Sequence, residues 1–146
     1  MKRFILSSIR IRSQASQIID ALINFDKLKQ WWGVDGGIIE PKDGGIYCIT
    51  WLKSDHGVKF VSTGRIKLLD KNAYLHLEDM IYINSEKGIL GPYDIQYELE
   101  SSANYCVLSV KQSGFKKEKS EFWYYEAVEK GWPEALVMLK KYLENS

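Results

Sequence analysis

The last quarter of the chain carries apolar residues at helical spacing. From residue 122 onward, the steps between successive apolar positions are three, three, four, four, three and four, which average 3.5 residues. This period is typical of an amphipathic helix and not of a strand. A helix with one continuous apolar face must bury that face, and we expect a sheet to cover it. The stripe consists of Phe122, Tyr125, Val128, Trp132, Leu136, Leu139 and Leu143.

Pro133 lies inside this stripe. Proline removes a backbone hydrogen bond and disfavours helical geometry at the residue before it. We therefore expect a kink or a restart of the helix at residues 131–133.

Most of the chain before the stripe alternates apolar and polar residues, as strands do. A first strand is predicted at residues 4–12, and a helical pair follows it, ending near residue 31. Short turns separate the later strands, so neighbouring strands should pair antiparallel. The six later strands are predicted at 38–39, 46–53, 58–69, 73–80, 93–100 and 105–112.

The alternation also predicts which side chains share a face. Tyr47 and Trp51 lie on one face of their strand, and the strand at 58–69 places Phe60 and Leu68 on one side. Gly64 sits in the middle of that strand, where a bulge or bend is usual, and the faces could slip by one residue near it.

Length and charge limit the classes of protein to which this chain can belong. The 146 residues predict a single domain, 1–146, and 20 Lys and Arg against 19 Asp and Glu give no reason to expect nucleic acid as a partner. Cys48 and Cys106 lie inside predicted strands without zinc-type spacing, so we expect free thiols. The N-terminal apolar run ends at Ser7, too short for a signal peptide or membrane span, so a cytoplasmic protein is expected.

Several short strings occur in a particular order along nearly the whole chain. They are Ala21-Leu22 leading to Trp31-Trp32; Pro41 with Asp43-Gly44-Gly45, Tyr47 and Trp51; Thr63-Gly64-Arg65-Ile66; Gln112-Ser113-Gly114-Phe115; and Gly131-Trp132-Pro133 with Leu136, Leu139-Lys140 and Leu143-Glu144. In this order they resemble the START-like (SRPBCC) superfamily, in particular its branch named after the activator of Hsp90 ATPase.

The resemblance implies an α+β helix-grip fold. In this fold an antiparallel sheet of six to seven strands wraps around a long C-terminal helix, a helical pair follows the first strand, and a cavity lies between sheet and helix. The feature that the superfamily shares is this cavity and not a catalytic motif, so the resemblance by itself implies no reaction.

Catalytic and metal-binding motifs are absent from the sequence. There is no GxSxG, HExxH or P-loop, and no GxGxxG stands between a strand and a helix. His56 is expected in an exposed turn, and His76 on the strand face opposite Leu75 and Leu77. We therefore predict no catalytic residue, no metal and no cofactor.

Aromatic side chains are the positive signal, at 13% of the chain. On the predicted inward faces they would form an apolar pocket with a few hydroxyl groups, which suits an apolar or aromatic ligand. Trp132 is expected to be chiefly structural. The predicted ligand-binding residues are Trp32, Tyr47, Trp51, Phe60, Tyr97, Phe122 and Tyr125.

Three functions remain open on these grounds. The first is non-enzymatic binding of a small hydrophobic or aromatic molecule, by a monomer or homodimer. The alternative is an Hsp90-type co-chaperone or protein-interaction module, with a chaperone as partner, which rests on the family name. The third is a cyclase- or hydrolase-like enzyme in the same cavity, for which Tyr47, Tyr97 and His76 are the titratable candidates.

Overall fold

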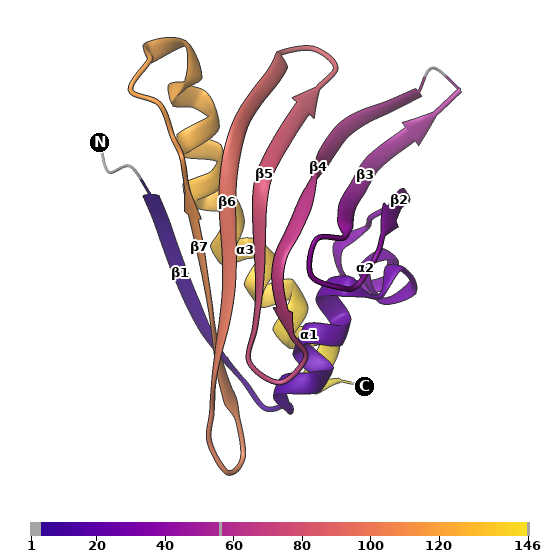
Figure 1. Cartoon of the computed structure of the whole chain (residues 1–146), viewed down its shortest axis with the longest axis vertical. Helices are drawn as coiled ribbons and strands as arrows, with labels where there is room; N and C mark the ends of the chain where they lie inside the picture. Colours follow the sequence, from indigo (N-terminus) through magenta and orange to yellow (C-terminus); the bar gives the residue numbers. More distant parts are fainter. Residues whose placement is uncertain (1–3, 56, 146) are drawn as a thin grey trace.

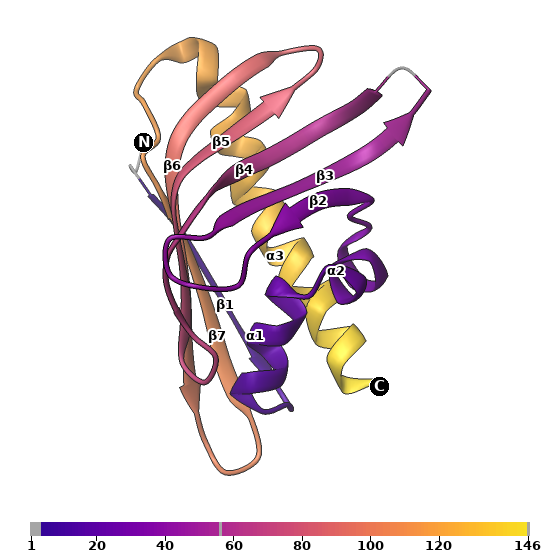
Figure 2. The same ribbon diagram turned by 45° about the vertical axis from the view of Figure 1, so that its right-hand side comes forward.

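A curved antiparallel sheet wraps around the long C-terminal helix (Figures 1 and 2). The computed structural model describes residues 4–55 and 57–145, so His56 lies outside the described residues. Within the described residues the sheet has seven strands in the order β1-β7-β6-β5-β4-β3-β2. This architecture confirms the predicted α+β helix-grip fold with its helical pair after the first strand.

The elements follow the predicted order. The strands are β1 (Phe4–Ile11), β2 (Gly36–Ile39), β3 (Ile46–Ser54), β4 (Gly57–Asp70), β5 (Tyr74–Asn84), β6 (Gly88–Ser101) and β7 (Cys106–Ser113). The helices are α1 (Ala15–Ile23), α2 (Phe25–Trp32), the short 3₁₀ helix η1 (Lys119–Glu121) and α3 (Phe122–Glu144).

The hairpin between β5 and β6 is longer than its sequence suggests. β5 continues to Asn84, beyond its predicted end at residue 80, and β6 begins at Gly88, before its predicted start at residue 93. The side-chain oxygen of Asn84 accepts hydrogen bonds from the backbone N–H groups of Glu86 and Lys87. This side chain closes a tight turn, so the residues on either side can stay in the ladder.

α3 is one continuous helix from Phe122 to Glu144 with Pro133 inside it. The restart expected at residues 131–133 was therefore wrong. Proline removes only one backbone hydrogen bond from a helix, and here the buried Trp132, Leu136 and Leu139 hold the helix against its neighbours on both sides of that position.

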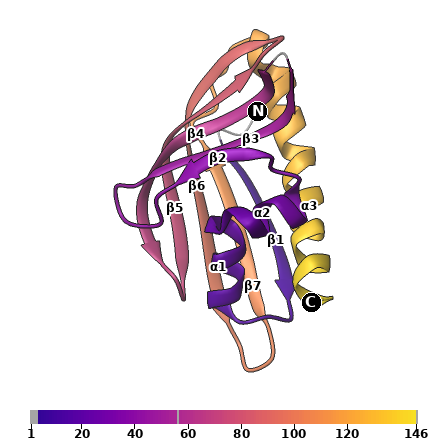
Figure 3. The same cartoon turned by 90° about the vertical axis from the view of Figure 1, so that its right-hand side faces the viewer.

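At one end of the molecule α1 and α2 lie beside the C-terminal half of α3 (Figures 1 and 3). Ile18, Ile19, Leu28 and Leu139 are fully buried there. The N-terminal half of α3 faces the other end of the sheet, where the pocket described below lies. None of the helices in residues 4–55 and 57–145 has the length and apolar character needed to cross a membrane.

Irregular pairing bends the middle of the sheet. The register between β4 and β5 shifts between Thr63 and Arg65 and again between Ile66 and Leu68. After the second shift Leu68 is 39% exposed, and Leu69 packs against the core. The prediction that Leu68 faces inward was therefore wrong, because the extra residue of a bulge moves the following side chains to the other face.

Candidate functional site

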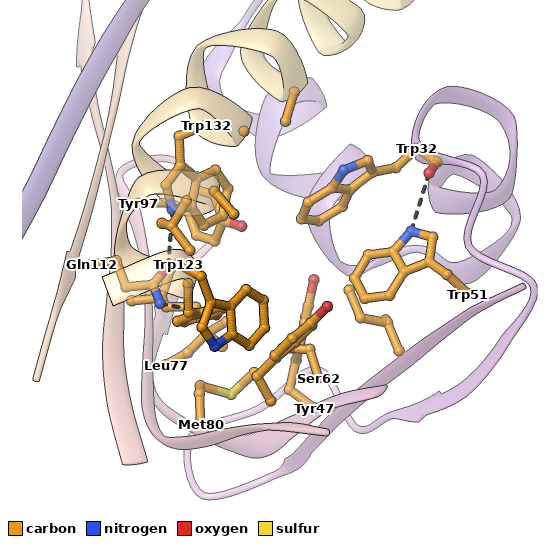
Figure 4. Close-up of a pocket in the computed structure, with 18 residues that line it drawn as sticks. Trp32, Tyr47, Trp51, Ser62, Leu77, Met80, Tyr97, Gln112, Trp123 and Trp132 are labelled. Atoms are coloured by element: carbon orange, nitrogen blue, oxygen red, sulfur yellow. Dashed lines mark hydrogen bonds between the residues drawn. The ribbon is translucent and has the colours of Figure 1, made fainter. Parts of the chain in front are cut away.

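A pocket of about 270 Å³ lies between the sheet and the N-terminal half of α3 (Figure 4). Its wall combines side chains from α2, from five strands, β3 to β7, and from α3. Ligand pockets typically span about 300–1,000 Å³. This pocket is close to the lower end of that range, so it suits a small molecule.

Four of the seven predicted ligand-binding residues meet around this pocket. Trp32 reaches it from the end of α2, Tyr47 and Trp51 from β3, and Tyr97 from β6. They are far apart in the sequence, and the curvature of the sheet brings them to a single concave surface (Figure 4).

The other three predicted residues lie outside the pocket lining. Phe60 stacks against Tyr82 with ring centroids 6.2 Å apart, and Tyr82 lines the pocket in its place. Phe122 is 40% exposed, and the buried Tyr125 packs edge-on against Phe115. Most of the predicted stripe is buried, and Val128 and Trp132 line the pocket, but the first turn of α3 presents Trp123 and Tyr124 to it instead of Phe122.

Sequence reasoning missed several lining residues. Trp123 and Tyr124 lie next to the apolar stripe, and the packing of the first turns of α3 against the sheet brings them to the pocket. Tyr82 follows the predicted end of its strand, and extending the alternation from Met80 would have found it. Gln112 could have been noticed as a polar residue at an inward position of β7, since inward polar groups in a core are uncommon.

Tryptophan side chains build one wall. Trp31 and Trp32 stack with centroids 4.9 Å apart, but Trp31 is buried and only Trp32 lines the pocket. Trp51 meets Trp32 edge-on at 5.3 Å, and its Nε1 donates a 3.2 Å hydrogen bond to the Trp32 carbonyl. Trp132 lies 5.9 Å from Trp32, ring centroid to ring centroid. The rings thereby hold one another in a defined orientation.

A buried glutamine holds Trp132 and Tyr124 in place. Gln112 is 2% exposed, and its Oε1 accepts a 2.9 Å hydrogen bond from Trp132 Nε1. Its Nε2 donates to the hydroxyl of Tyr124 at 3.4 Å. Trp132 in turn meets the ring of Tyr97 edge-on at 5.7 Å. This network connects β7, β6 and α3 and holds their side chains in place.

The titratable groups that line the pocket are phenols. Burial raises the pKa of Tyr47, Tyr82, Tyr97 and Tyr124 above the ordinary tyrosine value of 10.0. These hydroxyls therefore stay protonated at neutral pH and can donate hydrogen bonds. Among the described residues, no Asp, Glu, Lys, Arg or His lines the pocket.

High pH is expected to destabilise the fold through these tyrosines. The folded-state pKa of Tyr47, Tyr97 and Tyr124 lies above the unfolded value of 10.0, so their contribution is intact below about pH 10 and is lost as the pH rises beyond it. In a titration followed by tyrosinate absorbance and circular dichroism, part of the nine tyrosines should ionise only as the fold is lost. Ionisation of all nine with unchanged circular dichroism would contradict this expectation.

His76 lies outside the pocket. It pairs with the exposed Leu68 on the outer face of the sheet, while its neighbours Leu75 and Leu77 are buried. Its Nε2 lies 3.9 Å from a carboxylate oxygen of Glu98. Within the part of the chain that the structure describes, no group of three or more His, Cys, Asp or Glu residues could hold a metal ion.

Comparison with known proteins identifies relatives of this arrangement. The family model described as "Activator of Hsp90 ATPase homolog 1-like protein" matches residues 12–144. A search of the curated proteins found no match.

Solved structures share the fold over almost the whole chain. Protein MLL2253 from Mesorhizobium loti has a TM-score of 0.77 at 18% identity, with 99% of this chain and 98% of that chain covered. The Aha1 dimer from Colwellia psychrerythraea has a TM-score of 0.70 at 21% identity, with 97% and 96% covered. Protein NE0264 from Nitrosomonas europaea has a TM-score of 0.75 at 13% identity, with 97% and 94% covered. At these identities the likeness shows the fold alone.

Proposed function

The chain belongs to the family of activator of Hsp90 ATPase homolog 1-like proteins, and we propose that it binds a small apolar or aromatic molecule in its pocket without catalysing a reaction. The observation that carries this proposal is the composition of the pocket wall. Aromatic rings from α2, the sheet and α3 enclose an apolar space, and its polar groups are hydroxyls, indole N–H groups and one amide.

Such a wall suits binding better than acid–base chemistry. Burial of apolar surface supplies affinity of about 25 cal/mol per Å² of area removed from water, and a few polar groups supply orientation. A general base works best with a pKa near the operating pH, whereas the pKa values of Tyr47 and Tyr97 are raised above 10.0. The third candidate for an enzyme, His76, lies on the outer face.

Native mass spectrometry of the protein purified from its own host tests this function directly. A retained small molecule is expected, and its mass would identify the ligand class. Saturable binding of N-phenylnaphthylamine, an uncharged probe that fluoresces in apolar surroundings, is expected for the ligand-free protein. A mass without ligand together with no saturable probe binding would overturn the proposal.

Replacing Trp51 by alanine is expected to weaken binding of N-phenylnaphthylamine about tenfold, which corresponds to about 1.4 kcal/mol. The substitution removes the ring that meets Trp32 edge-on at 5.3 Å and that forms part of the pocket wall. Fluorescence titration measures the change, and circular dichroism checks that the variant is folded.

Phe122→Ala provides the matched control for Trp51→Ala. Phe122 is also an aromatic residue that the sequence assigned to the site, but it is partly exposed and lies outside the lining. Its truncation should leave probe affinity unchanged. Equal affinity of wild type and a folded Trp51→Ala variant would count against this pocket as the binding site.

A protein-interaction module is the second candidate, and it rests on the match of residues 12–144 to the family described as activator of Hsp90 ATPase homolog 1-like protein. Purified protein added to Hsp90 should then change its rate of ATP hydrolysis, and an unchanged rate would discard this candidate.

A further inference from the structure

The hydroxyl of Tyr97 opens onto the pocket and has no partner among the described residues. Tyr97 is 2% exposed and lines the pocket, and its hydroxyl makes no hydrogen bond to any described residue. Figure 4 shows its side chain beside Trp132, at the pocket. Hydroxyl groups in protein interiors are normally hydrogen-bonded, to protein, to water or to a ligand. The partner of this hydroxyl therefore has to come from whatever fills the pocket.

The other buried polar groups of the lining are already paired. The hydroxyl of Tyr47 already donates its proton to the Leu22 carbonyl at 2.6 Å. Trp132 Nε1 donates to Gln112, which also donates to Tyr124. Ser62, Trp32 and Trp123 also line the pocket, but they are only half-buried. Among the buried side chains of the lining, within the described residues, Tyr97 is the one whose donor remains available to a ligand.

The pocket offers no partner for a charge. None of the described lining residues carries an ionised side chain at neutral pH. A carboxylate or ammonium group that entered would lose its hydration without gaining an ion pair, which is strongly unfavourable. The size also matters, because an apolar cavity of about 150 Å³ holds benzene. A pocket of about 270 Å³ then suits a ligand of one or two rings.

We propose that the ligand is an uncharged molecule of one or two rings with a carbonyl oxygen, and that this oxygen accepts a hydrogen bond from Tyr97. This inference rests on the proposed binding function and adds the chemical class of the ligand. Carboxylates of the same shape are rejected. The raised pKa of Tyr97 agrees with a hydroxyl that keeps its proton for donation throughout the neutral range.

Three naphthalenes substituted at the same ring carbon test the proposal, because their substituents have nearly the same size. They are the methyl ketone, the isopropenyl hydrocarbon and the carboxylate, which is ionised at neutral pH. In calorimetric titrations the ketone should bind about fivefold tighter than the hydrocarbon, which is the order of one neutral hydrogen bond. The carboxylate should bind at least about tenfold more weakly than the hydrocarbon.

Tyr97→Phe removes the donor and leaves the ring. The variant should bind ketone and hydrocarbon with equal affinity, and its affinity for the hydrocarbon should match that of wild type. Tyr93→Phe is the control, since Tyr93 lies on the same strand and is buried, but it is not among the lining residues. This variant should keep the preference for the ketone.

The outcomes separate the two proposals. Equal binding of ketone and hydrocarbon by wild type, a ketone preference that survives in Tyr97→Phe, or tighter binding of the carboxylate would each overturn the inference. Saturable binding of the hydrocarbon in those cases would still support the proposed function. If none of the three compounds binds, the proposed function fails and the inference fails with it.

Discussion

Replacing Trp132 by alanine is expected to lower the free energy of unfolding by about 3–5 kcal/mol, the usual cost of truncating a buried tryptophan. Trp132 is 8% exposed and contacts Trp32 and Tyr97 through its ring. Its loss would also leave the buried Gln112 Oε1 without its 2.9 Å hydrogen bond. Urea denaturation followed by circular dichroism measures the change.

Trp132→Phe separates ring packing from the hydrogen bond. Phenylalanine retains most of the apolar volume but has no N–H group, so Gln112 Oε1 alone loses its partner. An unpaired buried acceptor costs about 1–3 kcal/mol, so this variant should fall between wild type and Trp132→Ala. A loss below about 1 kcal/mol for Trp132→Ala would show that this side chain does not support the fold.

Gly64→Ala is expected to lower the free energy of unfolding by about 2–3 kcal/mol, the range for overpacking in a tight site. A Cβ atom at Gly64 would lie 2.8 Å from the carbonyl oxygen of Glu78 and 2.9 Å from that of Asp79. It would also lie 2.5 Å from the sulfur of Met80. Methionine can move aside, but the two backbone oxygens belong to the bend of the sheet and can shift only together with it.

Gly131→Ala is the matched control for this prediction. A Cβ atom at Gly131 would meet nothing within 4 Å, and the residue lies inside α3. Alanine is favoured over glycine in a helix by about 0.5–1 kcal/mol, so this variant should be slightly more stable than wild type. Urea denaturation of both variants provides the comparison. Equal stability of Gly64→Ala and wild type would mean that β5 can withdraw from β4 without cost.

Local pattern was a sufficient guide to most of the architecture. The 3.5-residue period from residue 122 predicted α3, and alternation predicted the strands, because both periods come from the geometry of the chain itself. Short polar turns then implied antiparallel neighbours, as the sheet order confirms. The resemblance to the START-like superfamily added the way in which sheet and helix fit together.

Alternation failed where non-local contacts intervene. The bulges between β4 and β5 placed Leu69 inward instead of Leu68, and a side-chain bond at Asn84 extended β5 beyond its expected end. Neither the bulges nor the turn at Asn84 can be recognised from the alternation of apolar and polar residues within a single strand. Each arises from pairing with a neighbouring strand or from closing a turn.

The sequence by itself determined the order of helices and strands, the inward faces of the regular strands and the aromatic character of the space they enclose. Only the tertiary structure decided which rings line the pocket. Trp123 and Tyr124 line it in place of Phe122 and Tyr125, because Tyr124 packs against rings of the sheet while Tyr125 packs against Phe115. That Tyr97 keeps an unpaired hydroxyl while Tyr47 is paired with Leu22 was likewise decided by the tertiary structure. Hydrogen bonds between residues far apart in the sequence cannot be predicted from a periodic pattern.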